Sequence, residues 1–353
     1  MAEINLSDEE KYFIIVGVAQ DIRADGRARL DYRSKEIEAN VITNAHGSIR
    51  IKLAETDVII ATKVELGSPD EDKPELGKLE FLVDCSPLAS PEFEGRGGDQ
   101  LSETICGILT SSYSTSGAID MKSLCIVPEK FCYVINVDIL VLQCGGNLLD
   151  VIAMGCKACL GICEIPVVTG LRFDLGEPTP VFTTDEYEFT YLDVREAPVV
   201  VTLPRVGRYF VIDATIEEES CSKGKLAIGV TSKGDITSID KIGRCCYQLR
   251  SLAASIKLAA KVGQGLNKVL LEKIESIKSQ KKQLINPDFP EGYIRRKTYK
   301  ELVAGVDVKI VRVADVATVF AEEFPTATYS KPYLTEKLNQ ANFFSSDWTS
   351  GED

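Results

Sequence analysis

The segment from Val137 to Cys163 has the frame of an anion-binding site. A buried-strand pattern ends at Gly145-Gly146, and an apolar helix is expected after them, with Asn147 placed to cap it. A tight glycine turn before a helix can hold phosphate through free backbone N–H groups and the helix dipole. An enzyme that uses phosphate would normally add Arg, Lys, Ser or Thr in the first turn. Here the first turn carries Leu148, Leu149 and the acid Asp150, which repels phosphate, so a structural turn is the commoner interpretation.

The cysteines are a second group of residues that could do chemistry. Cys156, Cys159 and Cys163 fall on one face of the expected helix, where thiolates could converge on a metal. The sequence supplies no fourth ligand at a useful spacing. The single histidine, His46, lies in an expected turn without a nucleophile nearby. We therefore expect packed thiols, with no metal, no cofactor and no histidine-based catalysis.

Length and charge set broad limits on the class of protein. A chain of 353 residues can hold two domains, and no run approaches the roughly 20 apolar residues of a membrane span. Its first ten residues are polar and acidic, so no secretory signal is expected and the 11 cysteines fit a reducing compartment. The net charge is −13, but residues 201–312 carry 21 Lys and Arg against 12 Asp and Glu, a balance of +9 that leaves −22 elsewhere. This asymmetry favours charged partners or a local anion-binding face, or else a solvated helix surface.

The hydrophobic pattern predicts strands and then a helix, twice along the chain, after an opening helix or strand at Lys11–Val18. This order indicates an α+β protein built from two related layers. An acidic, proline-containing connection with one strand is expected at Leu171–Glu196. The expected strands are Ile37–Val41, Ser48–Leu53, Val58–Val64, Leu79–Val83, Leu124–Val127, Val134–Leu142, Val199–Leu203, Tyr209–Asp213, Lys225–Thr231 and Ile236–Ile239, and the expected helices are Gln100–Tyr113, Leu148–Cys163 and Gln248–Gln280.

Four ordered motifs resemble those of the RNase PH family, over about residues 8–280. They are Arg23-Ala24-Asp25-Gly26-Arg27, Glu92 to Asp99, Cys144 to Asp150, and Val211-Ile212-Asp213-Ala214-Thr215. The resemblance implies an RNase PH-like fold of two packed β-sheet and helix layers, similar to domain 2 of ribosomal protein S5. It implies a first domain at residues 1–196, a second at 197–283 and a C-terminal extension at 284–353. It further implies six such protomers around a pore through which single-stranded RNA passes.

The resemblance is greatest to a ring subunit of the eukaryotic exosome that is the counterpart of the non-catalytic partner in the archaeal ring. Family members that degrade RNA use inorganic phosphate as the nucleophile, held by cations and hydroxyls, and a carboxylate that protonates the leaving oxygen. Where active members have Thr-Arg after the paired glycines, this chain has Asn147 and Leu148, and the catalytic aspartate falls at Lys225. The helix Gln100–Tyr113 lacks the arginines of active members, although Glu219 matches an acidic position. We expect a catalytically inactive subunit.

Two other classes of function stay open at this stage. One is a phosphorolytic 3′-exoribonuclease that contributes half of a composite active site, with Lys63, Arg96, Arg205 and Arg208 as RNA-binding candidates. For each of these cations, the alternative to RNA binding is an ordinary salt bridge on the protein surface. The other is a small-molecule binder that uses the glycine turn, but no specificity residues adjoin that turn.

The expected partners and location follow from the resemblance. They are other RNase PH-like ring subunits, S1/KH-type cap subunits, exosome-associated nucleases and single-stranded RNA, with no membrane. The expected location is the nucleus, nucleolus and cytoplasm. In the extension, we expect the chain up to about residue 324 to pack on a protomer, and Phe343–Trp348 to dock on a partner or stay mobile.

Overall fold

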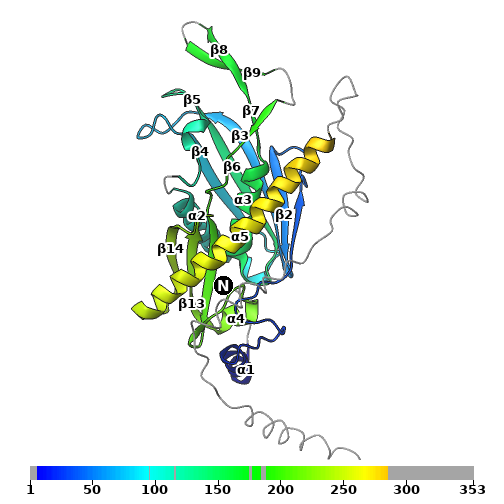
Figure 1. Ribbon diagram of the computed structural model, residues 1–353, viewed down its shortest axis with the longest axis vertical. Coiled ribbons are helices and arrows are strands. Elements are labelled where there is room, and N and C mark those ends of the chain that lie inside the picture. The colour runs from blue at the N-terminus through cyan, green and yellow to red at the C-terminus, as the bar shows by residue number, and fades with distance from the viewer. Residues whose placement is uncertain (1–5, 95, 115–116, 175–176, 184–187, 285–353) are drawn as a thin grey trace, which may run out of the picture. The chain divides into compact units, whose positions relative to one another are not determined.

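Two antiparallel-rich sheets carry most of the strands in the computed structural model, which describes residues 6–94, 96–114, 117–174, 177–183 and 188–284 (Figure 1). The first sheet is antiparallel except that its edge strand β4 runs parallel to β6. Its spatial order is β1 (Lys35–Ala39), β2 (Gly47–Leu53), β3 (Thr56–Gly67), β6 (Phe131–Gln143) and β4 (Lys78–Cys85), with β5 (Cys125–Val127) paired to β6.

The second sheet is fully antiparallel. Its order is β12 (Tyr209–Phe210), β11 (Val199–Val206), β13 (Ser222–Val230) and β14 (Ile236–Gly243). Two small two-stranded sheets pair β7 (Glu164–Pro166) with β10 (Phe189–Tyr191), and β8 (Val168–Asp174) with β9 (Glu177–Phe182).

A helix buried on every side joins the two sheets. All residues of α3 (Leu148–Ile162) are buried, because the helix is apolar around its whole circumference and contacts β2, β3, β11 and α5. The long helix α5 (Leu249–Leu284) packs on β11 and β13, and α2 (Arg96–Tyr113) packs on β4 of one sheet and β14 of the other. One continuous hydrophobic core therefore runs through both sheets. Figure 1 shows α5 in yellow passing across α3 and the second sheet.

Two shorter helices complete the described architecture. A capping box of Ser7 and Glu10 begins α1 (Asp8–Ala19), and one of Thr215 and Glu218 begins α4 (Ile216–Cys221). A second, small core forms where Val18 of α1 meets Val206 and Val211. Two 3₁₀ turns, Pro91–Phe93 and Met121–Leu124, lie between the larger elements.

Most predicted elements are confirmed, and the differences lie where local patterns are weak. The opening segment is a helix, and the short α4 was not predicted. The connection at Leu171–Glu196 was predicted to hold one strand, but it contains the end of β8 and all of β9 and β10. Pro180 sits in β9, opposite Leu171, because each strand of an isolated hairpin has an open edge that tolerates a residue without an N–H group.

The predicted domain boundaries stay predictions. The predicted extension 284–353, including Phe343–Trp348, lies outside the described residues apart from Leu284, the last residue of α5. No helix in the described part of the chain is long and apolar enough to cross a membrane.

Candidate functional site

The glycine turn is built for close backbone packing. Gly146 has φ +92°, and a Cβ there would lie 2.6 Å from the backbone nitrogen of Ile216 and 2.7 Å from the carbonyl oxygen of Ala214. The Thr56 hydroxyl accepts a hydrogen bond from the Gly145 N–H (3.2 Å) and donates one to the Gly146 carbonyl (2.7 Å). The turn thus brings the start of α3 against the loop that begins α4.

Asn147 occupies the predicted cap position but does not cap the helix with its side chain. It has left-handed backbone angles, and its side-chain amide donates to Asp150 (3.2 Å) and to Asp213 (2.9 Å). Its backbone N–H, which the sequence pattern assigned to a possible anion, donates to the Glu219 Oε1 atom at 3.1 Å. A carboxylate of the chain itself therefore lies where an external anion would have to bind.

Lys225 completes this arrangement. Its ammonium group donates to the same Glu219 oxygen at 3.1 Å, and the two side chains are only 13% and 15% exposed. The structure thus brings together three of the four positions that the sequence singled out around the glycine turn, Asn147, Glu219 and Lys225. The charges of Glu219 and Lys225 compensate each other inside the protein.

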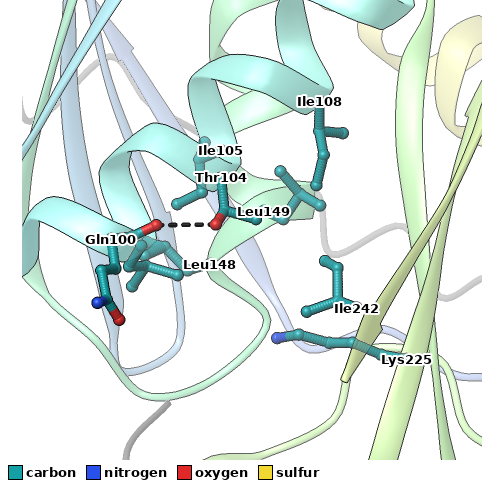
Figure 2. Close-up of a pocket in the computed structure, with 9 residues that line it drawn as sticks. Gln100, Thr104, Ile105, Ile108, Leu148, Leu149, Lys225 and Ile242 are labelled. Carbon is teal, nitrogen blue, oxygen red and sulfur yellow. Dashed lines mark hydrogen bonds between the residues drawn. The ribbon is translucent and has the colours of Figure 1, made fainter. Parts of the chain in front are cut away.

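The fourth of these positions, Leu148, lines a pocket of about 210 Å³ between α2, the start of α3 and the second sheet. Figure 2 shows Leu148 and Leu149 beside α2, with Lys225 and Ile242 across from them. Thr104 bonds within α2, to the carbonyl of Gln100 at 2.8 Å. Lys225 is the one cation among the described lining residues, which are Gln100, Leu101, Thr104, Ile105, Ile108, Leu148, Leu149, Lys225 and Ile242. Because the lining is mainly apolar, it offers few hydrogen bonds or charges to replace the water that phosphate would lose on binding.

A buried carboxylate, Asp213, organises the back of the turn. Arg33 donates to both of its oxygens (2.8 Å at Oδ1, 3.0 Å at Oδ2), and Arg27 adds a bond at 3.0 Å. Burial raises the pKa of Asp213, but the hydrogen bonds and charge of Arg33 outweigh it, so the pKa lies below its ordinary value. Arg33 also donates to the carbonyls of Gly145 and Gly146. The arginine therefore clamps the glycine turn to the second sheet.

Arg23 makes a second buried link between the same parts of the chain. Its guanidinium donates to both carboxylate oxygens of Glu218, with Nε to Oε1 at 2.8 Å, and to the carbonyls of Ile212 and Asp213. The first, third and fourth sequence motifs thus meet in one network. Arg33 was missed by sequence reasoning, because it and Asp213 are 180 residues apart and no spacing pattern joins them.

Asp150, the acid that the sequence predicts to repel phosphate in the first turn of the helix, lies inside the protein. It is fully buried and accepts hydrogen bonds from the Thr202 N–H (2.7 Å), the Tyr32 hydroxyl (3.0 Å) and Asn147. Burial raises its pKa to about 7, against the lowering effect of these bonds. Asp150 therefore belongs to the internal network.

The RNA-binding candidates fall in separate places. Lys63 lies on β3 and pairs with Glu65 at 2.6 Å, whereas Arg205 at the end of β11 donates to the Cys246 carbonyl at 2.9 Å. Arg208, in the turn between β11 and β12, is exposed and forms no hydrogen bond or ion pair with the described residues. Arg96 is the first residue of α2, and its side chain lies outside the described part. No contact among the described residues joins Lys63 to Arg205 or Arg208.

The helical cysteines are packed thiols. Cys156, Cys159 and Cys163 are buried and free, and burial raises the pKa of Cys159 to about 12 and that of Cys163 to about 11. The described residues contain no group of three or more His, Cys, Asp or Glu side chains placed to hold a metal.

Comparison with known proteins places the fold and motifs in a family. Residues 31–166 match domain 1 and residues 196–262 match domain 2 of the 3′ exoribonuclease family, RNase PH. Together these matches cover more than half of the chain. The chain therefore belongs to the RNase PH family, and the predicted family and α+β fold are confirmed.

The similar proteins are exosome components. The Rrp42 exosome component of Thermococcus kodakarensis is 34% identical over 252 residues, covering 71% of this chain and 90% of the relative. The protein of Dictyostelium discoideum named "Putative exosome complex exonuclease RRP42" is 32% identical over 289 residues, covering 67% of this chain and 88% of the relative. A chain of the Archaeoglobus fulgidus exosome with RNA bound to the active site superimposes with a TM-score of 0.64 and 29% identity, covering 74% of this chain and 97% of that one.

Proposed function

We propose that this chain is a non-catalytic structural subunit of a hexameric exosome ring. In that ring it helps to form the pore that channels single-stranded RNA, and so supports 3′-to-5′ RNA processing and degradation. The Rrp42 relatives and the archaeal exosome neighbour support the ring role. The second part of the proposal is that the subunit is not catalytic, and this part rests on the geometry of the glycine turn.

The observation that supports the lack of catalysis is the hydrogen bond from the Asn147 N–H to Glu219. Phosphorolysis needs a phosphate held beside the scissile bond by N–H groups and cations. Here a carboxylate already takes the N–H group, and it would repel a second anion at close range in a poorly hydrated site. Lys225 is engaged by that carboxylate, and Leu148 and Leu149 present hydrocarbon to the adjoining pocket.

The test is a phosphorolysis assay on the purified chain. With labelled single-stranded RNA and inorganic phosphate, we expect no nucleoside diphosphate above the buffer control. A catalytically active member of the family serves as the positive control. Lys225→Asp should not create activity, because it restores the family's acidic residue but leaves phosphate unheld and adds a second carboxylate beside Glu219. Phosphate-dependent release of diphosphates by the pure wild-type chain would contradict the proposal.

A second candidate is that the subunit lends cations to RNA at a site shared with a neighbour. The observation that favours it is Arg208, an exposed cation without a partner in the described part of the chain. This role is compatible with catalytic silence, because a positioning contact to a phosphate needs only charge.

We further propose cap subunits of the S1/KH type and exosome-associated nucleases as partners, and the nucleus, nucleolus and cytoplasm as locations. These follow from the family resemblance. Native mass spectrometry of the complex purified through this chain tests the partners, and imaging of the tagged chain tests its distribution.

A further inference from the structure

One face of the first helix, α1, packs against the rest of the chain. Ile14, Ile15 and Val18 pack in the small core that includes Val206 and Val211. Ile15 lies against Gly207 in the turn after β11, since a Cβ at Gly207 would be 3.0 Å from the Ile15 side chain. These contacts fix which side of the helix is turned toward the second sheet.

The opposite side of α1 is aromatic, and no described part of the chain covers it. Tyr12 is 71% exposed and Phe13 is 69% exposed. Because an α-helix turns by about 100° per residue, both rings point roughly 110° or more away from the mean direction of the three inward residues. They therefore cannot reach the same core. A helix that is apolar on all faces is normally covered on all faces, and exposed aromatic rings are the kind of side chain that dominates protein–protein contacts.

The charges beside these rings restrict what covers them. Asp8, Glu9 and Glu10 form the exposed first turn, with Lys11 as the only nearby cation in the helix. RNA bases can stack on aromatic rings, but the phosphates of RNA would then lie near three carboxylates. A protein surface with basic side chains around an apolar pocket would bury the two rings and also pair with the acidic side chains of the first turn.

We propose that α1 is a docking element, and that Tyr12 and Phe13 insert into an apolar pocket rimmed by basic side chains on another protein subunit. The inference deepens the proposed ring function and rests on it, since the partner is sought among the proteins of that assembly. The acidic first turn steers and orients the contact, and the two rings supply its buried apolar area.

The experiment uses the full chain and an exosome core reconstituted from purified ring and cap subunits of the same organism. The double variant Tyr12→Ser, Phe13→Ser should weaken association with one subunit about tenfold or more. Asp8→Lys, Glu9→Lys should weaken it more at low salt than at high salt. Glu10 is left intact because it closes the capping box with Ser7. Leu88→Ser is the matched control, since Leu88 is 93% exposed on a different segment, and it should not change the affinity.

A photocrosslinking residue at position 13, with position 88 as control, identifies what α1 touches. Crosslinks from position 13 to a single protein subunit are expected. Crosslinks to RNA or to a second copy of this chain, or none, overturn the inference. If the wild-type chain assembles and the Tyr12, Phe13 variant assembles equally well, the inference is wrong and the ring function stands. If the wild-type chain joins none of the subunits, both are overturned.

Discussion

At the scale of single residues, Asp213 connects three distant parts of the chain. Its buried carboxylate accepts hydrogen bonds from Arg27 and Arg33 near the N-terminus and from Asn147 at the start of α3. A buried charge of this kind is tolerated because each oxygen is paired. Removing the charge therefore leaves two guanidinium groups without their shared counter-ion.

We expect Asp213→Asn to lower the free energy of unfolding by about 3–5 kcal/mol, the usual cost of breaking a buried ion pair. Urea denaturation followed by circular dichroism measures the change. Asp193→Asn is the matched control, because Asp193 also bonds an arginine, Arg195, but both side chains are more than half exposed. A loss of stability as small as that of the control would show that the network contributes little.

The same carboxylate predicts a pH dependence with a definite sign. The pKa of Asp213 is lower in the folded protein than its ordinary value of about 3.9. Its contribution to stability is therefore complete above about pH 4 and is lost as the pH falls through the folded pKa. Unfolding free energies of wild type and Asp213→Asn should converge as the pH falls below about 4. Parallel curves throughout the acid range would be evidence against this assignment.

At the scale of elements, the glycine turn decides how α3 meets the loop before α4. Gly146 needs both its positive φ and the space that a Cβ would fill. Gly26 has a similar φ of +80°, but no atom lies within 4 Å of a Cβ placed there. Alanine substitutions at Gly26 and Gly146 therefore separate the energetic cost of backbone strain from the cost of steric crowding.

Gly26→Ala should cost about 1–2 kcal/mol of stability, the strain of a left-handed alanine. Gly146→Ala should cost at least about 2 kcal/mol more, because the added methyl group meets the backbone of Ile216 and Ala214, which cannot move aside as a side chain would. Thermal and urea unfolding of the two variants measure the difference. Equal losses would mean that the turn relaxes freely.

At the scale of the whole molecule, the proposed contact to RNA belongs to the assembled ring. Arg208→Glu should weaken binding of single-stranded RNA and reduce the slope of log affinity against log salt by about 0.7 for each phosphate that the ring no longer neutralises. Lys63→Glu should have a smaller effect, because Lys63 already pairs with Glu65. Filter binding across a salt series on reconstituted rings checks both. Unchanged affinity for the Arg208 variant would remove that residue from the RNA path.

The sequence by itself determined most of the elements and the class of the chain. The alternating and continuous apolar runs of β2, β3, β6 and β11 and the helical periods of α2, α3 and α5 are local signals, set by neighbours a few residues apart. The four family motifs could likewise be recognised in the amino-acid sequence alone. The lack of Arg and Lys in the four residues after Gly145-Gly146 could be recognised from residue types alone.

Only the tertiary structure decided which groups surround the glycine turn. The bond from the Asn147 N–H to Glu219 spans 72 residues, and that from Arg33 to Asp213 spans 180. The sequence predicted Asn147 as a side-chain cap and Asp150 as an acid that repels phosphate, whereas the structure shows that both side chains form part of the buried network. A local pattern records which face of a segment is apolar, but a hydrogen bond between distant segments depends on how the sheets and α3 pack together.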